Sequence, residues 1–242
     1  MTKLSVNINK IATLRNSRGG NLPNLLQCAL DIEKWGAHGI TVHPRPDERH
    51  IRKSDVYELK KHVTTEFNIE GYPSDDWISL VQEIRPTQCT LVPDPPHALT
   101  SNAGFVVEHH VYLLSHAIEK LRQIETRISL FIDPFDYLDK DILPIVQTGV
   151  DRVELYTESY AKAFGTSKEE DVLSVYQRVG QKLHEAGLGI NAGHDLNLQN
   201  LSKFIQALPF VSEVSIGHAL ICDALYVGLE QSVKGYLAVL GS

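Results

Sequence analysis

The sequence predicts a (β/α)8 TIM barrel, an α/β fold built on eight parallel strands. Eight short β-rich runs alternate with longer amphipathic stretches along the 242 residues, and this alternation is typical of parallel βαβ units. Eight units in a chain of this length match the barrel closely and leave room for extra helices. A doubly wound open sheet is the structural alternative, but its usual early Gly-x-Gly-x-x-Gly turn is absent.

The predicted strands share short runs of aliphatic and β-branched residues. In chain order they cover residues 4–9, 39–44, 67–72, 88–93, 127–133, 152–157, 188–194 and 213–218. The predicted helices share apolar residues at three- and four-residue spacing, as in Leu173, Tyr176 and Val179. They cover residues 22–35, 54–66, 75–84, 106–123, 140–148, 168–186, 198–207 and 219–240.

Capping signals agree with this division. Ser54 and Ser74 stand where helices should begin, and the glycines of residues 35–39, 149–151 and 185–189 are typical of helix C-caps that lead into strands. No Pro/Ser-rich linker or low-complexity tract interrupts the chain, so residues 1–242 are expected to form one domain.

Composition excludes several classes of protein. The net charge of −7 argues against a general nucleic-acid role. No run reaches the roughly 18 apolar residues of a membrane span, and the first residues lack the apolar centre of a signal peptide. Three widely spaced cysteines suit a reducing compartment. We therefore expect a soluble cytoplasmic protein with no membrane or nucleic-acid partner.

Polar and ionisable residues occupy the carboxyl ends of nearly all predicted strands, where the active site of such a barrel lies. They are Asn7, Asn9, His43, Arg45, Glu70, Asp133, Glu154, Asn191, His194, Gly217 and His218. One such residue, for example Asp133, has a plain explanation, because strands end in solvated loops. Three histidines, two carboxylates and an arginine on one rim indicate a site.

Four of these residues suit acid–base chemistry. His43 and His194 can each take or give a proton near neutral pH. Partial burial is expected to raise the pKa of Glu70 toward that of a useful base. Glu154 can stabilise a developing cation such as an iminium, and a salt bridge to a neighbouring arginine or lysine is the alternative reading.

Other residues suit anion binding. Gly217 and His218 join the last strand directly to a helix, so backbone N–H groups meet a helix N-terminus there. Residues 1–53 carry nine basic and four acidic side chains, with Arg18 after the first strand and Arg45 and His50 after the second. These loops predict more than one phosphate site, and a solvated run of charges is the alternative for Arg49 and Arg52.

Nine segments in order along the chain resemble the pyridoxine 5′-phosphate synthase family. They are residues 7–16 with 18–19, 39–47, 49–51, 67–70, 90–93, 129–133, 152–157, 191–194 and 216–219. The resemblance implies a TIM barrel that condenses 3-amino-2-oxopropyl phosphate with 1-deoxy-D-xylulose 5-phosphate to pyridoxine 5′-phosphate, releasing phosphate and water. It also implies no metal or organic cofactor, and a homo-oligomer, namely an octamer.

By position, the resemblance makes His43 and Glu70 proton acceptors, His194 a proton donor and Glu154 a stabiliser of the transition state. Further residues match contacts to the two substrates. For the aminoketone phosphate they are Asn7, Arg18, Gly217 and His218, and for deoxyxylulose phosphate they are Arg45, His50 and Thr100.

The chain departs from the family pattern at three places. Asn9 and Lys10 replace an Asp-His pair at a substrate-binding position, Asp195 replaces a glycine where a phosphate should bind, and the pair that follows Glu70 is Gly71-Tyr72. Asp195 should repel an anion unless it turns away or pairs with a cation. Two other classes of function stay open: a metal-dependent hydrolase with His43, His194 and His218 as ligands, and a non-catalytic sensor of phosphorylated metabolites.

Overall fold

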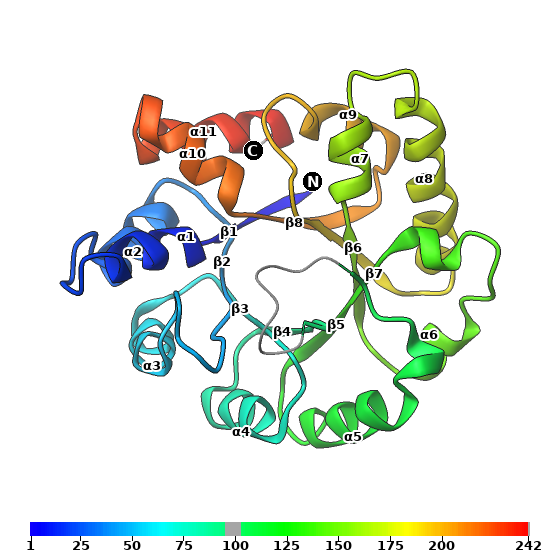
Figure 1. Ribbon diagram of the computed structural model, residues 1–242, viewed down its shortest axis with the longest axis horizontal. Helices are drawn as coiled ribbons and strands as arrows, with labels where there is room; N and C mark the ends of the chain where they lie inside the picture. Colours follow the sequence, from blue (N-terminus) through cyan, green and yellow to red (C-terminus); the bar gives the residue numbers. More distant parts are fainter. Residues whose placement is uncertain (95–102, 242) are drawn as a thin grey trace.

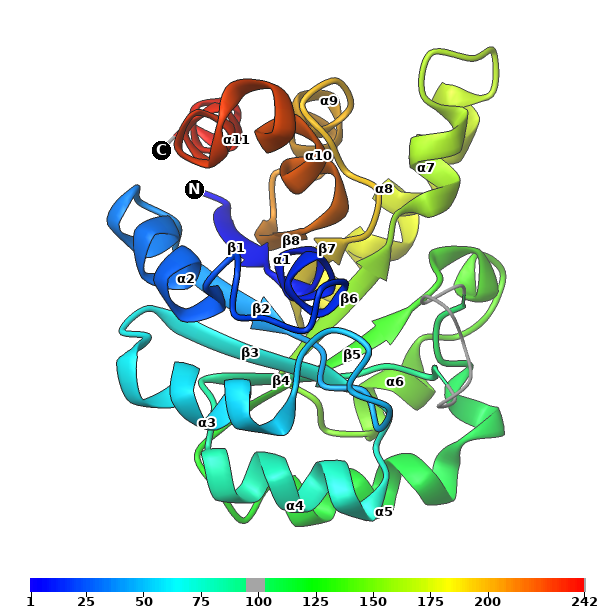
Figure 2. The same cartoon turned by 60° about the vertical axis from the view of Figure 1, so that its left-hand side comes forward.

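Eight parallel strands close into a barrel, as the sequence predicts (Figure 1). The computed structural model describes residues 1–94 and 103–241. Each strand pairs in parallel with the next along the chain, and β8 pairs with β1 to close the ring. The helices surround this ring, and Figure 2 shows them from a second direction.

The strands end one or two residues before the predicted ends. They are β1 Lys3–Asn7, β2 Gly39–Val42, β3 Glu66–Gly71, β4 Gln88–Leu91, β5 Arg127–Ile132, β6 Arg152–Tyr156, β7 Gly189–Gly193 and β8 Val211–Ile216. Pro44 and Pro93 have no N–H to continue a ladder. Asn9 and His218 instead begin helices, so several predicted strand ends are loop or helix residues.

Most helices lie around the outside of the barrel, whereas α1 and α7 directly follow the carboxyl ends of β1 and β6. They are α1 Asn9–Asn16, α2 Leu25–Lys34, α3 Lys53–His62, α4 Asp75–Ile84, α5 Val111–Leu121, α6 Leu143–Gln147, α7 Glu158–Ala163, α8 Glu169–Glu185, α9 Leu201–Ala207, α10 His218–Val227 and α11 Leu229–Leu240, with 3-10 turns η1 Val107–His109 and η2 Pro134–Tyr137. Among residues 1–94 and 103–241, no helix is both long and apolar enough to cross a bilayer.

Several helix predictions need correction. α1 and α7 were not predicted, and the predicted helix 219–240 breaks at Gly228, whose φ is +85°. α3 begins at Lys53 rather than at Ser54, because the Asp55 carboxylate accepts the Arg52 N–H. Ser74 caps α4 as predicted, since its hydroxyl accepts the Trp77 N–H.

The two faces of the strands differ sharply. Outward side chains such as Val6, Ile40 and Ile69 are fully buried in the apolar core under the helices. The inward side chains include polar ones. Ser5 and Asn68 lie on the same strand faces as Asn7 and Glu70, two residues further along, and Asn7 and Glu70 line the cavity described below. Hydrogen bonds join this inner layer, for example Ser5 Oγ to Thr41 Oγ1 at 2.7 Å. A second inner layer centres on Glu213, which accepts from Gln88 and Asn191.

Candidate active site

A cavity of about 460 Å³ opens at the carboxyl ends of the strands. Among the described residues it is lined by Asn7, Asn9, Lys10, Thr13, His43, Arg45, Arg49, His50, Glu70, Glu154, Tyr156, Glu158, His194, Asp195, Leu196, Ser215, Ile216, Gly217, His218 and Ala219. The four predicted acid–base residues therefore share one cavity, as does most of the predicted binding set.

His43 and Glu70 lie beside each other on the β2–β3 side. His43 Nδ1 is 3.8 Å from Glu70 Oε2, and Asn7 Nδ2 donates to the same oxygen at 3.4 Å. Asn9 fixes the end of β2, because its Oδ1 accepts the His43 backbone N–H at 2.9 Å. Asn9 itself is held by its N–H, which donates to Asn7 Oδ1 at 3.0 Å. Asn9 is thus a positioning residue for His43.

Burial shifts the pKa values of this pair toward the neutral forms. Burial raises the pKa of Glu70 to about 7, opposed by the charge of His194 and reinforced by that of Asp94. The pKa of His43 falls well below its usual value, first by burial and then by the charges of Arg45 and His50. Near neutral pH, Glu70 is therefore present in both protonation states beside an uncharged imidazole, as expected of a proton acceptor.

Glu154 points into the cavity from β6 and is only 3 % exposed. Its Oε2 has no hydrogen-bond partner among the described residues. Burial, followed by the charges of Glu70 and Glu213, raises the pKa of Glu154 well above its usual value. No arginine or lysine of the described chain pairs with it, so the alternative reading of a salt bridge is not supported. The neighbouring Gly193 leaves room for it, because a Cβ there would lie 2.3 Å from Glu154 Oε1.

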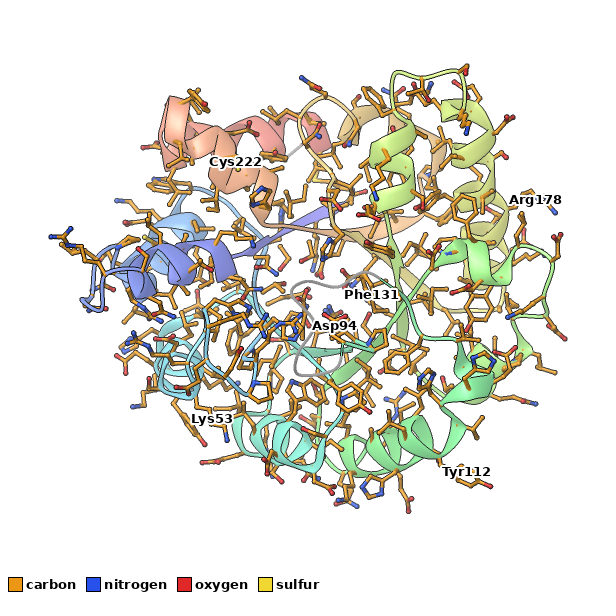
Figure 3. The ribbon with its side chains drawn as sticks, in the orientation of Figure 1. Lys53, Asp94, Tyr112, Phe131, Arg178 and Cys222 are labelled. Atoms are coloured by element: carbon orange, nitrogen blue, oxygen red, sulfur yellow. The ribbon has the colours of Figure 1, made fainter. Side chains whose placement is uncertain are left out.

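His194 follows β7 on the opposite side of the cavity. Its ring packs edge-on against Tyr156 and Phe131, with centroids 5.4 Å and 6.2 Å away, and Figure 3 places Phe131 near the middle of the barrel. Its Nδ1 lies 3.5 Å from Asp195 Oδ2. Asp195 thus lies beside a basic group. Pairing with a cation is one of the two arrangements, with turning away, that are expected to reduce the repulsion between Asp195 and a bound anion.

Backbone N–H groups for an anion lie at the start of α10. Gly217 precedes the helix, and Gly217, His218 and Ala219 all line the cavity. A Cβ at Gly217 would lie 3.0 Å from the Cβ and carbonyl oxygen of Asn7, so only glycine lets β1 and this turn approach so closely. A turn at a helix N-terminus can offer backbone N–H groups to a phosphate.

The basic residues predicted for a second phosphate differ in their surroundings. Lys10, Arg49 and His50 line the cavity, and burial, helped by the charges of Arg45 and Lys10, lowers the pKa of His50 to about 4. Arg45 also lines the cavity, but its Nη2 contacts Asp94 Oδ2 at 2.6 Å. Figure 3 shows Asp94 close to the centre of the barrel, away from peripheral residues such as Arg178.

Some predicted residues lie elsewhere. Arg18 is exposed in the turn after α1 and does not line the cavity, and Thr100 lies outside the described residues. Asp133 accepts the Phe135 N–H at 3.0 Å and is not part of the cavity wall. Asn191 donates to Glu213 in the second inner layer. Arg52 donates to Asn16 Oδ1, away from the cavity.

The sequence reading missed some residues that line the cavity. Tyr156 and Ser215 each lie two residues from a predicted site residue on the same strand or its end, so strand alternation could have identified them. Thr13 lies on α1, which was not predicted, and Glu158 begins the unpredicted α7.

No metal-binding arrangement is visible in residues 1–94 and 103–241. Groups of three or more His, Cys, Asp or Glu side chains placed to hold a metal ion are absent from these parts of the chain. His43, His194 and His218, the ligands of the hydrolase alternative, all line the cavity but do not form such a group.

Solved structures of other barrels resemble this one in fold alone. N-(5′-phosphoribosyl)anthranilate isomerase from Pyrococcus furiosus superposes with a TM-score of 0.65 at 12% identity, over 99% of this chain and 98% of that one. For 3-keto-L-gulonate-6-phosphate decarboxylase from Vibrio cholerae the TM-score is 0.63 at 9% identity, over 99% of this chain and 97% of that one.

Sequence relatives are much more similar. Pyridoxine 5′-phosphate synthase from Porphyromonas gingivalis is 56% identical over 98% of both chains, and that from Cytophaga hutchinsonii is 54% identical over 99% of both. The family model described as "Pyridoxal phosphate biosynthesis protein PdxJ" matches residues 4–242. The chain belongs to this family of pyridoxal phosphate biosynthesis proteins.

Proposed function

We propose that this protein is a pyridoxine 5′-phosphate synthase, which condenses 3-amino-2-oxopropyl phosphate with 1-deoxy-D-xylulose 5-phosphate. The products are pyridoxine 5′-phosphate, inorganic phosphate and water. The observation that carries the proposal is one cavity containing His43, Glu70, Glu154 and His194, in a chain at least 50% identical to relatives that bear this name.

The reaction class fits the groups in the cavity. An amine and a ketone join as an imine with loss of water, and closing an aromatic ring requires protons to be removed from carbon and delivered to leaving oxygens. Several acid–base groups must therefore reach one bound intermediate. Among the described residues, four carboxyl side chains and four imidazoles line this cavity.

Glu70 and His43 are assigned to proton removal. Burial brings the pKa of Glu70 to about 7, so this carboxylate can accept a proton and return it without a large free-energy change. His43 is held uncharged by burial, which lowers its pKa, and its ring is therefore ready to accept a proton. His194, on the opposite wall, is assigned to proton delivery to a leaving oxygen.

Glu154 is assigned to charge stabilisation. Its pKa is raised by burial and by the charge of Glu70, which favours its neutral form when the cavity holds no cation. A positively charged iminium in the cavity offsets the repulsion from Glu70 and favours the ionised form of Glu154. The carboxylate then stabilises the cation at the moment it develops.

The phosphate groups are assigned to two regions. The turn at Gly217 and His218, with Asn7, takes the aminoketone phosphate. Arg18, which the family resemblance adds to this set, lies outside the cavity wall and is not assigned a contact. The deoxyxylulose phosphate is assigned to the rim formed by the segments that follow β1 and β2, where the family resemblance points. The contacts that the resemblance implies there are Asn9, Lys10, Arg45 and His50, which all line the cavity. The helix N-terminus and the basic rim support this division.

The proposal extends to the setting of the enzyme. As in the family it resembles, we place it in the cytoplasm as a homo-octamer built from one barrel domain per chain. It acts on small phosphorylated molecules, without a membrane or nucleic-acid partner. The reaction as assigned here needs no metal or organic cofactor, since every proton transfer is given to a side chain.

Purified protein incubated with both substrates tests the proposal. Pyridoxine 5′-phosphate, detected by mass spectrometry, should form only when both substrates are present. A folded protein that binds the substrates but yields no product would instead favour the metabolite-sensor alternative.

A further inference from the structure

The turn that carries His194 has an unusual backbone. His194 and Asp195 have φ angles of +77° and +59°, both in the left-handed region that residues other than glycine seldom adopt. Such strain persists when the surrounding structure holds it, and it is concentrated at functional sites. We propose that Asp195 is a positioning residue that holds the His194 ring with Nδ1 protonated and Nε2 directed to the substrate.

The geometry of the pair supports this role. Asp195 Oδ2 lies 3.5 Å from His194 Nδ1, and the side chains are 42% and 31% exposed. The rings of Tyr156 and Phe131 pack edge-on against the imidazole. With one nitrogen next to a carboxylate and aromatic rings at its sides, the imidazole has Nε2 left for a ligand in the cavity.

Buried polar side chains hold the turn in place. The Thr157 hydroxyl donates to the His194 carbonyl, and Asn200 Nδ2 donates to the Asp195 carbonyl at 3.2 Å. Thr157 and Asn200 are 0% and 1% exposed. Asn200 is itself fixed, since its Oδ1 accepts the Asn197 N–H at 2.8 Å. These hydrogen bonds fix the backbone of the turn, and with it the direction in which the Asp195 side chain leaves the chain.

The charges around Asp195 keep it ionised. The His194 imidazole, followed by the charges of His218 and Lys162, lowers the pKa of Asp195 despite its partial burial. A carboxylate beside Nδ1 favours a proton on that nitrogen. A histidine side chain free in water prefers the proton on Nε2, so Asp195 reverses the preferred tautomer.

The consequence for the reaction rests on the proposed function. With Nδ1–H held toward Asp195, His194 takes up its second proton at Nε2 and gives the same proton to a leaving oxygen. The Asp195 carboxylate offsets the positive charge while the ring is protonated. Asp195 acts only through His194, which explains why a carboxylate is tolerated beside the proposed phosphate turn.

The tautomer can be read directly without substrate. In ¹⁵N NMR spectra of the intact protein, with the His194 signals identified by their loss in His194→Gln, Nδ1 should appear protonated and Nε2 unprotonated at high pH. In Asp195→Gly the proton should move mainly to Nε2. Asp195→Asn should retain the Nδ1 proton in part, because its amide oxygen still accepts. An unchanged tautomer in Asp195→Gly overturns the proposal.

Kinetics gives a second readout. Asp195→Gly should fold normally, because glycine adopts positive φ freely, and its kcat should fall about tenfold, as for loss of a carboxylate that orients a histidine. The KM of the aminoketone phosphate should change less than about twofold. Asp195→Asn should recover part of kcat. The control Asp139→Asn removes the same charge from an exposed residue outside the cavity wall and should leave kcat unchanged.

The outcomes separate the two proposals. A lower KM with unchanged kcat in Asp195→Gly would mean that the carboxylate only repels phosphate, which contradicts the positioning role. If the wild-type protein forms no product while the tautomer still depends on Asp195, the proposed function fails and the structural role of Asp195 stands.

Discussion

The Glu70 carboxylate lies 3.8 Å from His43 Nδ1, and burial shifts the pKa of each toward its neutral form. A carboxyl group and an imidazole at this distance usually favour the ionised form of each other. Here burial outweighs that attraction, since both side chains are inside the barrel with Asn7 as a further neighbour of Glu70. Near neutral pH the pair therefore carries a proton on Glu70 or on neither residue, which suits a group that accepts a proton and returns it.

This relationship predicts the pH dependence of turnover. Burial raises the pKa of Glu70 in the ligand-free protein to about 7, and a proton acceptor must be ionised, so kcat/KM should rise with pH with a midpoint near 7. Glu70→Gln should lose this limb and lower kcat/KM by about 10²–10⁴, the range for a positioned base. The measurement is kcat/KM across pH 5–9. A wild-type profile that is flat through pH 7 would show that Glu70 is not the acceptor.

Glu154 predicts a pH dependence of stability. Burial and the charge of Glu70 raise the folded-state pKa of Glu154 above its unfolded value. The contribution of Glu154 to the free energy of unfolding is therefore fully present below about pH 4.3. It is lost as the pH rises toward the folded-state pKa. Glu154→Gln cannot ionise, so its melting temperature relative to wild type should be higher at pH 8 than at pH 4.

The exposed Glu119 on α5 provides the matched control for that experiment. Glu119→Gln should shift the melting temperature equally at both pH values. If Glu154→Gln behaves like this control, Glu154 is ionised in the folded protein. Its assigned role, to ionise only when a cation forms in the cavity, is then wrong.

Lys10 predicts a binding effect separate from chemistry. It lines the cavity on the side of His50, whose pKa its charge lowers, whereas Asn9 holds the His43 backbone. Lys10→Ala should raise the KM of deoxyxylulose phosphate about tenfold, as for one charge-assisted hydrogen bond, with kcat within a few-fold. Lys34→Ala, an exposed lysine outside the cavity wall, is the control.

The opposite outcome for Lys10 would be informative. A collapse of kcat in Lys10→Ala at unchanged KM would make the amine a chemical participant. Replacing Asn9 and Lys10 together by Asp and His should preserve activity, because Asp can still accept the His43 N–H.

Gly217 predicts where a phosphate binds. A Cβ at Gly217 would be 3.0 Å from Asn7, so Gly217→Ala must displace the turn that begins α10. The KM of the aminoketone phosphate should rise about tenfold or more, and inorganic phosphate should compete with this substrate less well than in wild type. Gly235→Ala on α11, where a Cβ meets only Leu198 at 3.8 Å, should behave as wild type. Equal inhibition by phosphate in both variants would place the anion elsewhere.

The barrel and its catalytic side were predictable from local patterns. Each strand is a short apolar run, and carboxyl ends of parallel strands meet at one rim, which is why His43, Glu70, Glu154 and His194 could be placed together. The break at Gly228 was not predicted, because apolar spacing continues through it and only the positive φ reveals it. α1 and α7 were missed because they are short and rich in polar residues.

The partners of site residues could not be derived from strand patterns. Arg45 contacts Asp94 from a different strand end, and Asp195 faces His194 only because two successive residues adopt left-handed conformations. Arg18 follows the first strand as expected but lies outside the cavity wall, since α1 intervenes. These outcomes depend on loop geometry, which residue spacing does not encode.

The central claim is that one cavity joins two phosphorylated substrates, and isotope labelling tests it most directly. Wild-type protein given ¹⁵N-labelled aminoketone phosphate and ¹³C-labelled deoxyxylulose phosphate should yield pyridoxine 5′-phosphate that carries both labels. His43→Ala should form it about 10²–10⁴ times more slowly, and His62→Ala, which changes an exposed histidine on α3, at the wild-type rate. Absence of the doubly labelled product from folded wild-type protein, or equal rates in His43→Ala and His62→Ala, would contradict the account.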